Sequence, residues 1–346
     1  MTLRMEIVNP LDQPGWGDLL MTHKESTFFH TAAWAKVLHE SYGYDPTYIT
    51  IMDGPDLLAL IPLMDVRSFL TGRRGVSLPF TDCCDPLITK GVLFGEIIDD
   101  LIEYGKQAKW NYLELRTAHP LPAEIPASAI FHGHTLDITG SEDAIFSALR
   151  DSTRRNIKKS EKEGVVVTIS GSADSLREFY RLNCMTRRDH GLPCQPYVFF
   201  ENIYSHIIAR NLGIVVLAAI EGKKIAGAVF FHFGSRAIYK FGASDRNYLQ
   251  LRSNNLVFWK AIQWYCGHGF KRLDFGRTES ENTGLLQFKR GWGASEYQIN
   301  YCKYDFRQRA YVSDHLKVTG WHNSIFRRMP VPLLRIAGSM LYRHVG

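Results

Sequence analysis

The sequence predicts an α/β (α+β) protein made of two consecutive copies of one unit. Each half shows the same order of elements: a helix, a hairpin, a second helix and a strand. The hairpin turns at Asp53-Gly54 and Glu221-Gly222 lie 168 residues apart, and strands beginning at Leu113 and Leu273 lie 160 apart. These spacings favour a tandem repeat over one large sheet, although element order alone also arises by chance. We therefore expect domains at residues 1–145 and 146–346, each a mixed sheet flanked by helices.

The composition is that of a soluble globular protein. A chain of 346 residues with 45% hydrophobic and 22% charged residues suits two domains of ordinary size. No apolar run approaches the ~20 residues of a membrane span, and the start lacks the layout of a signal peptide, so we expect a cytoplasmic protein. The six cysteines form no C-x-x-C pair and have no neighbouring histidine cluster. We expect reduced thiols, no metal site and no cofactor.

In the first half, residues 28–42 predict a helix that is capped at Thr31 and ends at Gly43. A hairpin over residues 48–66 follows, with its turn at 53–56. Residues 76–89 read as an irregular strand and loop. The half then closes with a helix at 93–108 and strands at 112–116 and 134–138.

In the second half, the same reasoning predicts helices at 173–189 and 197–210, a hairpin over 214–233, a strand at 237–243, a helix at 254–266 and a strand at 272–275. That last strand ends at Gly276-Arg277, and a polar loop over 278–283 follows it. Charges beyond the end of a strand are where α/β folds place ligands. The cations Arg277, Lys289 and Arg290 therefore favour an anionic or carbonyl-bearing ligand; the alternative is a tight corner with solvated charges.

A basic helix is predicted at 152–163, between the two halves, with Ser152 as its N-cap and Gly164 as its stop. Its cations form two adjacent rows at four-residue spacing, Arg154, Lys158 and Lys162 beside Arg155 and Lys159. Like-charged pairs at this spacing each cost about 0.2–0.5 kcal/mol, so we expect an anionic partner such as a diphosphate or a nucleic acid backbone. The alternative is a solvated connector that Glu161 and Glu163 balance.

The C-terminal tail is also basic. Residues 307–346 hold seven lysines or arginines against one acid, Asp314. This tail is compatible with peripheral contact at the inner membrane surface, with RNA or with a polyanionic substrate; the alternative is a solubilising face.

Several motifs together resemble the Fem-type aminoacyl- and acyltransferases. They are R-R-N-I-K-K-S-E-K-E-G at 154–164, Y-K-F-G-A-S at 239–244, L-D-F-G-R at 273–277 and F-K-R-G-W-G at 288–293, with F-F-H-T-A-A-W at 28–34 and R-I-A-G-S-M-L-Y-R at 335–343. The resemblance spans almost the whole chain. It is closest to the branch found beside exopolysaccharide and protein-sorting systems.

This resemblance implies two acetyltransferase-like (GNAT) units in tandem and transfer of an activated acyl group to an amine or hydroxyl. The acceptor would be an anionic cell-envelope precursor or a polysaccharide-linked molecule. In the peptidoglycan enzymes of the family the donor is an aminoacyl-tRNA. The chain shows no heptad run for the long helical arm that many of them carry. The loop at 244–254 contains no glycine, so an acyl-CoA held in the usual GNAT manner is not expected, although Arg246 and Arg252 there can bind phosphate. The donor stays open between a charged tRNA and another activated acyl group.

The resemblance also implies roles for individual residues. Lys289 would stabilise the negative charge that develops during transfer, and Asp274 would orient it or Arg277. Phe288 and Trp292 would wall the pocket.

Arg277 and the helix cations Arg154, Arg155 and Lys158 would bind anionic groups of the substrates, and Tyr239 would donate a hydrogen bond. Asp82 and Asp85 are weaker candidates for the proton acceptor. No Ser-His-Asp or Cys-His spacing stands out, so direct transfer is expected. The rival prediction is a non-catalytic binding or scaffold protein for an anionic glycolipid or nucleotide-sugar.

Overall fold

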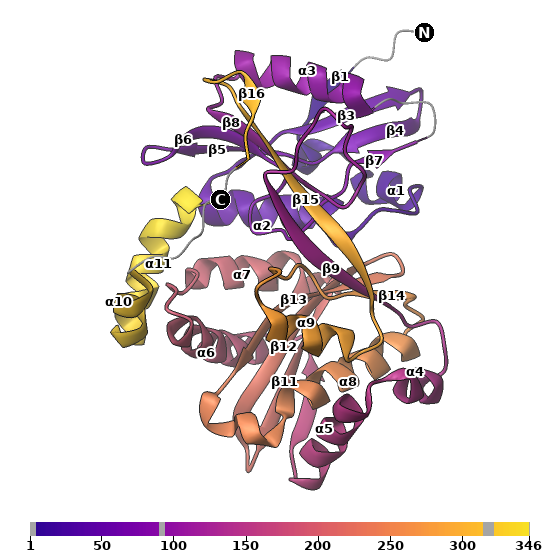
Figure 1. Cartoon of the computed structure of the whole chain (residues 1–346), viewed down its shortest axis with the longest axis vertical. Coiled ribbons are helices and arrows are strands. Elements are labelled where there is room, and N and C mark those ends of the chain that lie inside the picture. Colours follow the sequence, from indigo (N-terminus) through magenta and orange to yellow (C-terminus); the bar gives the residue numbers. More distant parts are fainter. Residues whose placement is uncertain (1–4, 90–93, 314–321, 346) are drawn as a thin grey trace. The chain divides into compact units, whose positions relative to one another are not determined.

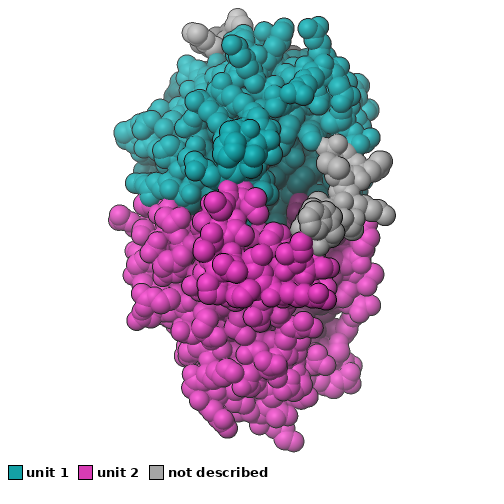
Figure 2. Space-filling model, turned by 90° about the vertical axis from the view of Figure 1, so that its left-hand side faces the viewer, with its two compact units in different colours: residues 1–132, 298–317, 342–346 teal, residues 133–297, 318–341 magenta. Residues whose placement is uncertain are grey.

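A computed structural model describes residues 5–89, 94–313 and 322–345, which divide into two units (Figures 1 and 2). Unit 1 contains residues 1–132, 298–317 and 342–346, and unit 2 contains 133–297 and 318–341. We predicted consecutive domains, 1–145 and 146–346. The units differ from that division because unit 1 also includes residues 298–317 and 342–346, and unit 2 resumes at 318–341. Strand β15 (Ser295–Asp305) returns to unit 1 and pairs antiparallel with β8 (Tyr112–Thr117) there.

Unit 2 is built on the strand order β10-β11-β12-β13-β14-β9. The pairs are antiparallel except for β13 and β14, which run parallel. Its strands are β9 (Ala129–Asp137), β10 (Val166–Ser170), β11 (Gly213–Ile220), β12 (Lys223–Phe233), β13 (Arg236–Ser244) and β14 (Arg272–Asp274). Its helices are α4 (Glu142–Ala148), α5 (Asp151–Lys162), α6 (Ala173–Asp189), α7 (Tyr197–His206), η3 (Ile208–Arg210), η4 (Arg246–Leu251), α8 (Ser253–Gly267), α9 (Thr283–Arg290), α10 (His322–Arg328) and α11 (Val331–Val345).

Two helices cover opposite faces of this sheet because side chains alternate along the strands. Val216, Ala228 and Phe230 belong to the buried cluster that also contains the apolar residues of α8. On the other face, Phe179 of α6 fills the space beside Gly227. Both faces of β11 and β12 are therefore buried, which explains their nearly continuous apolar sequence.

Most predicted elements of this half are confirmed within two residues. The helix predicted at 254–266 is α8, and the strand predicted at 237–243 is β13. The basic helix runs from 151 to 162, with Arg150 and not Ser152 at its N-cap, and Gly164 stops it with φ +79°. The sequence analysis did not identify α9, which starts where the Asn282 side chain accepts from the Leu285 backbone N–H.

Unit 1 contains two sheets. One has the order β1-β3-β4-β7, and the other contains β15-β8-β6-β5-β2, with β6 and β8 parallel and β16 paired to β15. The further strands are β1 (Met5–Val8), β2 (Asp45–Pro46), β3 (Tyr48–Asp53), β4 (Asp56–Ile61), β5 (Met64–Ser68), β6 (Gly72–Val76), β7 (Leu87–Ile88) and β16 (Ala310–Tyr311). The helices are η1 (Pro10–Asp12), α1 (Trp16–Met21), η2 (Phe28–His30), α2 (Ala32–Tyr42) and α3 (Phe94–Gln107).

The repeat inferred from the sequence is visible in the connections. In each unit a helix links two parallel neighbouring strands, β6-α3-β8 in unit 1 and β13-α8-β14 in unit 2. The copies are unequal, because the hairpin β3-β4 lies in the separate four-stranded sheet whereas β11-β12 joins the main sheet. The fold is an α/β arrangement of two units with related connections.

Strands β9 and β15 each run from one unit into the other. Of the helices that the structure describes, none combines the length and the apolar content that crossing a bilayer requires. The predicted basic tail is described in part, as α10 and α11; residues 314–321 and 346 lie outside the described residues.

We expect Gly213→Ala to destabilise unit 2. A Cβ at this position of β11 would lie 2.6 Å from the Phe230 carbonyl oxygen, which is backbone and cannot rotate away. The free energy of unfolding should fall by about 1–3 kcal/mol in a denaturant titration. Gly171→Ala is the matched control, because its nearest contact would be Ile208 at 3.8 Å. Equal stability of the two variants would contradict this account of β11 packing.

Candidate functional site

The candidate site of unit 2 begins where two parallel strands separate. Strands β13 and β14 pair only at Arg236–Arg272, Ala237–Leu273 and Ile238–Asp274. Beyond these pairs β13 continues to Ser244, whereas the chain leaves β14 and turns at Gly276, which has φ +67°. A separation at the carboxyl end of parallel strands is a common ligand position in α/β folds.

Hydrogen bonds to both the backbone N–H and the carbonyl oxygen of Gly276 hold this turn. Asp274 Oδ1 accepts from the Gly276 backbone N–H at 2.7 Å, and Lys289 Nζ donates to the Gly276 carbonyl at 2.7 Å. Lys289 also donates to the Arg277 carbonyl at 3.0 Å, and the Tyr297 hydroxyl donates to Asp274 Oδ2. The two residues predicted to be catalytic are therefore brought together through the peptide groups of Gly276.

Lys289 is buried, with 2% of its surface exposed. It lies in the last turn of α9, and its two hydrogen bonds to carbonyl oxygens join this helix to the end of β14. A buried ammonium group needs such partners, because an unpaired charge is very unfavourable away from water. In this structure Lys289 therefore shapes the wall of the site.

A cavity of about 280 Å³, here called the strand cavity, lies beside the separated strands. Its lining includes Tyr239 and Gly242 of β13, Phe258 of α8, and Leu285 and Phe288 of α9. Tyr239 packs on Phe258 with ring centroids 4.6 Å apart. A Cβ at position 242 would lie 1.8 Å from the Tyr239 hydroxyl oxygen, so glycine is required for this position of the ring.

A β-bulge in β13 occurs at the same place. Val229 pairs with Phe241 and the next residue, Phe230, pairs with Tyr239, so Lys240 is an extra residue on β13. Bulges bend a strand and redirect its side chains, and they are frequent next to active sites. This bulge sets the direction of Tyr239 and leads β13 away from β14.

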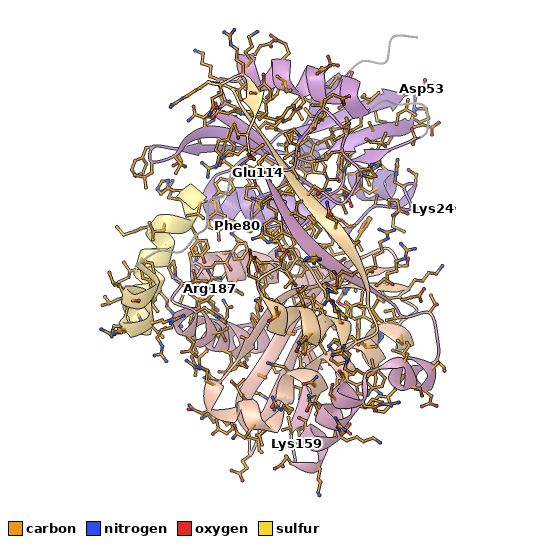
Figure 3. The ribbon with its side chains drawn as sticks, in the orientation of Figure 1. Lys24, Asp53, Phe80, Glu114, Lys159 and Arg187 are labelled. Atoms are coloured by element: carbon orange, nitrogen blue, oxygen red, sulfur yellow. The ribbon has the colours of Figure 1, made fainter. Side chains whose placement is uncertain are left out.

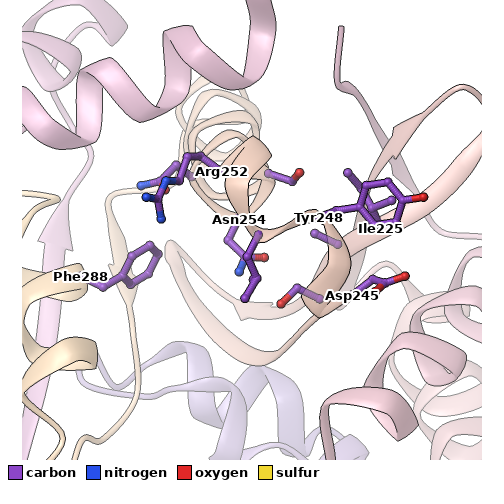
Figure 4. Close-up of a pocket in the computed structure, with 11 residues that line it drawn as sticks. Ile225, Asp245, Tyr248, Arg252, Asn254 and Phe288 are labelled. Atoms are coloured by element: carbon purple, nitrogen blue, oxygen red, sulfur yellow. The ribbon is translucent and has the colours of Figure 1, made fainter. Parts of the chain in front are cut away.

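A second cavity, of about 220 Å³, lies against the N-terminus of α8 and is called here the loop cavity (Figure 4). It shares Ser244, Asn254 and Phe288 with the strand cavity. Figure 4 shows Arg252, Asn254 and Phe288 around it. Tyr248 of η4 and Asp245, the residue before η4, also line it. The two cavities adjoin: the rings of Tyr239 and Phe258 line the strand cavity, and Arg252 lines the loop cavity.

The loop cavity contains groups that suit an anion. No side chain caps the N-terminus of α8, where Arg252 adopts a left-handed conformation with φ +59°. Ser253 is 5% exposed, and its hydroxyl, which lines the cavity, makes no hydrogen bond within the described residues. Helix N-termini favour negative groups. The carboxylate of Asp245 opposes this preference, but Lys223 Nζ lies 3.7 Å from it.

The other predicted residues lie outside the two cavities. Trp292 is buried in the core and stacks on Phe258 at 5.5 Å. Arg277 is partly exposed, with Nη2 3.9 Å from Glu279 Oε1. In unit 1, Asp85 Oδ1 accepts three hydrogen bonds, from Thr117 and from the backbone N–H groups of residues 118 and 119, so this carboxylate orders a turn.

Helix α5 presents its cations to solvent and packs against α8. Arg155 and Lys158 are exposed, as is Lys159, which is labelled in Figure 3. Arg154 is half-buried, pairs with Asp151 and donates to the Ser147 carbonyl at 3.1 Å. Ile157 is buried in the cluster that also contains residues of α8, so this basic helix has a core face.

A histidine missed by the site prediction lies beside Lys289. His134 of β9 is buried, and its Nε2 lies 3.3 Å from Glu296 Oε2. Glu296 also accepts two hydrogen bonds from Arg290, at 2.7 and 3.1 Å. Burial lowers the pKa of His134 below its ordinary value of 6.5, and the positive charge of Lys289 lowers this pKa further. The ring is therefore neutral near pH 7.

Of the predicted site residues, Tyr239 and Phe288 line the cavities, and Asp274 and Lys289 form their support. The sequence analysis missed Ser253, Asn254 and Ser244. The sequence signal for these residues is the loop at 244–254, which has no glycine pattern but carries polar side chains up to the start of the following helix. Among the described residues, no group of three or more histidine, cysteine, aspartate or glutamate side chains is placed to hold a metal ion.

Comparison with known proteins gives concordant results. Residues 147–294 match the acetyltransferase (GNAT) domain family. The chain is 28% identical over 159 residues to the UDP-N-acetylmuramoylpentapeptide-lysine N(6)-alanyltransferase of Weissella viridescens, covering 44% of this chain and 46% of that protein. It is 35% identical over 79 residues to the lipid II:glycine glycyltransferase of Staphylococcus haemolyticus, covering 21% and 19%. The matches thus span less than half the length of these relatives.

Among solved structures, the crystal structure of FemX is similar over 88% of this chain and 98% of its own, with a TM-score of 0.68 and 14% sequence identity. This likeness concerns the fold.

We expect Lys289→Met to lower stability, because it leaves the carbonyls of Gly276 and Arg277 without their donor. The loss should be roughly 2–4 kcal/mol, measured by thermal and denaturant unfolding. Gln287→Met, an exposed position on the same helix, is the control and should unfold like the wild type. An unchanged melting temperature of Lys289→Met would show that the hydrogen bonds from Lys289 to the carbonyls of Gly276 and Arg277 do not stabilise the fold.

Protonation of His134 should destabilise the folded state. Its pKa is lowered in the folded protein, so its contribution is complete above pH 6.5 and is lost as the pH falls through the folded value. Burial also lowers the pKa values of His30 and His232, so all three contribute to the acid sensitivity of the wild type. His134→Gln should therefore flatten the decrease in melting temperature below pH 6.5, whereas the exposed control His119→Gln should not. Identical pH profiles for the wild type and His134→Gln would refute this.

Proposed function

We propose, since this chain belongs to the Fem-like family of tandem GNAT proteins, that it transfers an acyl or aminoacyl group from an activated donor to an amine of a cell-envelope precursor. The observation that carries the proposal is the opening between β13 and β14, where a cavity lined by aromatic rings adjoins an uncapped helix N-terminus. One compartment suits an acyl group and the other suits the phosphate of its carrier.

The acceptor class follows from the two curated relatives. One is named as an alanyltransferase acting on lysine N(6) of a muramoyl-pentapeptide, and the other as a glycyltransferase acting on lipid II:glycine. Both names describe an amine acceptor on an envelope precursor, and this shared chemistry is what we propose here. A polysaccharide-linked amine or hydroxyl is a variant of the same class.

The reaction needs one bond to form and one to break. The acceptor nitrogen attacks the donor carbonyl carbon, and the bond from this carbon to the carrier oxygen or sulfur breaks. The acceptor loses one proton and the leaving atom gains one. We place the acyl group in the strand cavity, where the Tyr239 hydroxyl would donate a hydrogen bond to the developing oxyanion or to the leaving atom.

Lys289 and Asp274 support this site as positioning residues. They hold Gly276 from its carbonyl and its N–H, which keeps the end of β14 apart from β13. Phe288, which precedes Lys289 on α9, lines both cavities. Helix α9 therefore connects the hydrogen bonds of Lys289 to the cavity walls that would contact the donor. Direct charge stabilisation by Lys289 would require its ammonium group to leave the two carbonyls during the reaction.

The donor carrier is proposed to bind at the N-terminus of α8. Arg252, the Ser253 hydroxyl and Asn254 line this compartment, and together they suit a phosphate group. The exposed cations of α5, including Arg155 and Lys158, offer further contacts for a long polyanion such as tRNA. A charged tRNA and an acyl-CoA share the phosphate chemistry, and assays with each donor separate them.

The test is transfer of a radiolabelled acyl group. The purified chain is supplied with aminoacyl-tRNA or acetyl-CoA as donor, and with UDP-N-acetylmuramoyl-pentapeptide or lipid II as acceptor. We expect Arg252→Ala to raise KM for the donor about tenfold or more with little change in melting temperature, as for loss of a charge-assisted contact. Arg246→Ala is the matched control, because Arg246 lies on the same loop but outside both cavities.

Two results would overturn the proposal. The first is the absence of transfer with every donor and acceptor by a folded protein, which would favour a non-catalytic binding role. The second is equal KM values for the Arg252 and Arg246 variants in an active protein, which would remove the donor from the α8 N-terminus.

A further inference from the structure

The C-terminal helix α11 has a buried face that fixes it to the protein. Leu334 is fully buried, and four residues later a Cβ at Gly338 would lie 1.6 Å from the Cys194 carbonyl oxygen. The backbone of α11 therefore lies directly against the segment that follows α6. Arg335 extends this attachment, because its guanidinium lies 4.9 Å from the centre of the Tyr180 ring.

A second apolar stripe on α11 faces solvent. Leu333, Ile336 and Met340 follow each other at spacings of three and four residues, so they share one side of the helix. Their exposed fractions are 51%, 56% and 67%. A helix with apolar side chains on both its attached and its free side is ordinarily covered on both.

Basic residues surround this stripe. Between residues 322 and 341 the sequence contains Arg327, Arg328 and Arg335 and no acidic residue, and these three arginines are exposed. On α10, Ser324, Ile325, Arg328 and Met329 line a shallow hollow of about 350 Å³. Ile325 is itself largely exposed, so α10 also combines an apolar side chain with a neighbouring cation.

We propose that this α10–α11 face, formed by Ile325, Arg327, Arg328, Leu333, Ile336 and Met340, binds an anionic lipid bilayer. The two helices, drawn in yellow in Figure 1, lie along the membrane surface with the aliphatic side chains below the headgroups. The arginines contact lipid phosphates, which complement their charge. The absence of acidic residues and the aliphatic character of the stripe select a lipid surface over a protein partner. The inference narrows the membrane contact predicted for the basic tail and does not depend on acyl transfer.

Vesicle sedimentation tests the proposal without any assay of activity. The full chain is mixed with vesicles of phosphatidylcholine, with or without phosphatidylglycerol. We expect binding to the vesicles that contain phosphatidylglycerol, weakening as the salt concentration rises. Ile336→Ser/Met340→Ser should reduce the bound fraction roughly tenfold or more, since two apolar side chains that would insert into the bilayer are lost. Arg327→Ser/Arg328→Ser should weaken binding mainly at low salt.

The matched control is Met21→Ser/Val166→Ser, which replaces side chains that are 60% and 63% exposed elsewhere on the protein. It should bind like the wild type. Because all these positions are exposed, the melting temperatures of the variants should stay near that of the wild type, which excludes unfolding as the cause.

Failure of the wild type to bind phosphatidylglycerol vesicles would overturn the inference, as would equal binding by Ile336→Ser/Met340→Ser. Sedimentation equilibrium provides a third arm. A dimer that dissociates on Ile336→Ser/Met340→Ser would assign this face to contact between copies of the chain and would also overturn the proposal.

Discussion

The site in unit 2 depends on how one residue is held. Gly276 ends a short parallel strand, and its two peptide groups are bound by an aspartate on one side and a lysine on the other. Burying an ammonium group is unfavourable unless its donors are used, so the position of Lys289 and the course of the turn fix each other. If β14 instead continued beside β13, ladder hydrogen bonds would close the opening that Tyr239 and Phe288 now line.

The loop cavity differs from the phosphate-binding loop of ordinary acetyltransferases in the groups that it presents. A glycine-rich loop offers backbone N–H groups, which need close approach and little side-chain bulk. Here the loop at 244–254 has no glycine, and the left-handed Arg252 leads into a helix start with Ser253, Asn254 and Asn255 at the cavity. In the proposed function, side chains with hydroxyl, amide and guanidinium groups would therefore take over part of the contact with phosphate. This difference suits a donor other than the one that glycine loops hold.

Much of the fold could be predicted from the sequence because its signals are local. The continuous apolar runs of β11 and β12, the N-cap position of Thr31 and the Gly43 stop all depend on residues close together in the chain. The division into units could not be predicted, since it depends on the pairing of β15 with the distant β8. Within the site, the motif identified Phe288, Lys289 and Trp292 together but not their directions. Helix α9, which was not predicted, directs Phe288 to the cavities and Lys289 to the carbonyls, and Trp292 follows the helix and is buried in the core.

The strands β9 and β15 have a consequence for how the protein is made. Unit 1 takes its strand β15 from a part of the chain that follows most of unit 2, so unit 1 is not encoded by one uninterrupted stretch. During synthesis, the first unit cannot complete its pairing until residue 305 has left the ribosome, and its early strands must wait with open edges. Such non-local closure slows folding and lengthens the exposure of apolar surface. The nascent chain therefore exposes apolar surface and open strand edges for a long interval, and chaperones bind such surfaces.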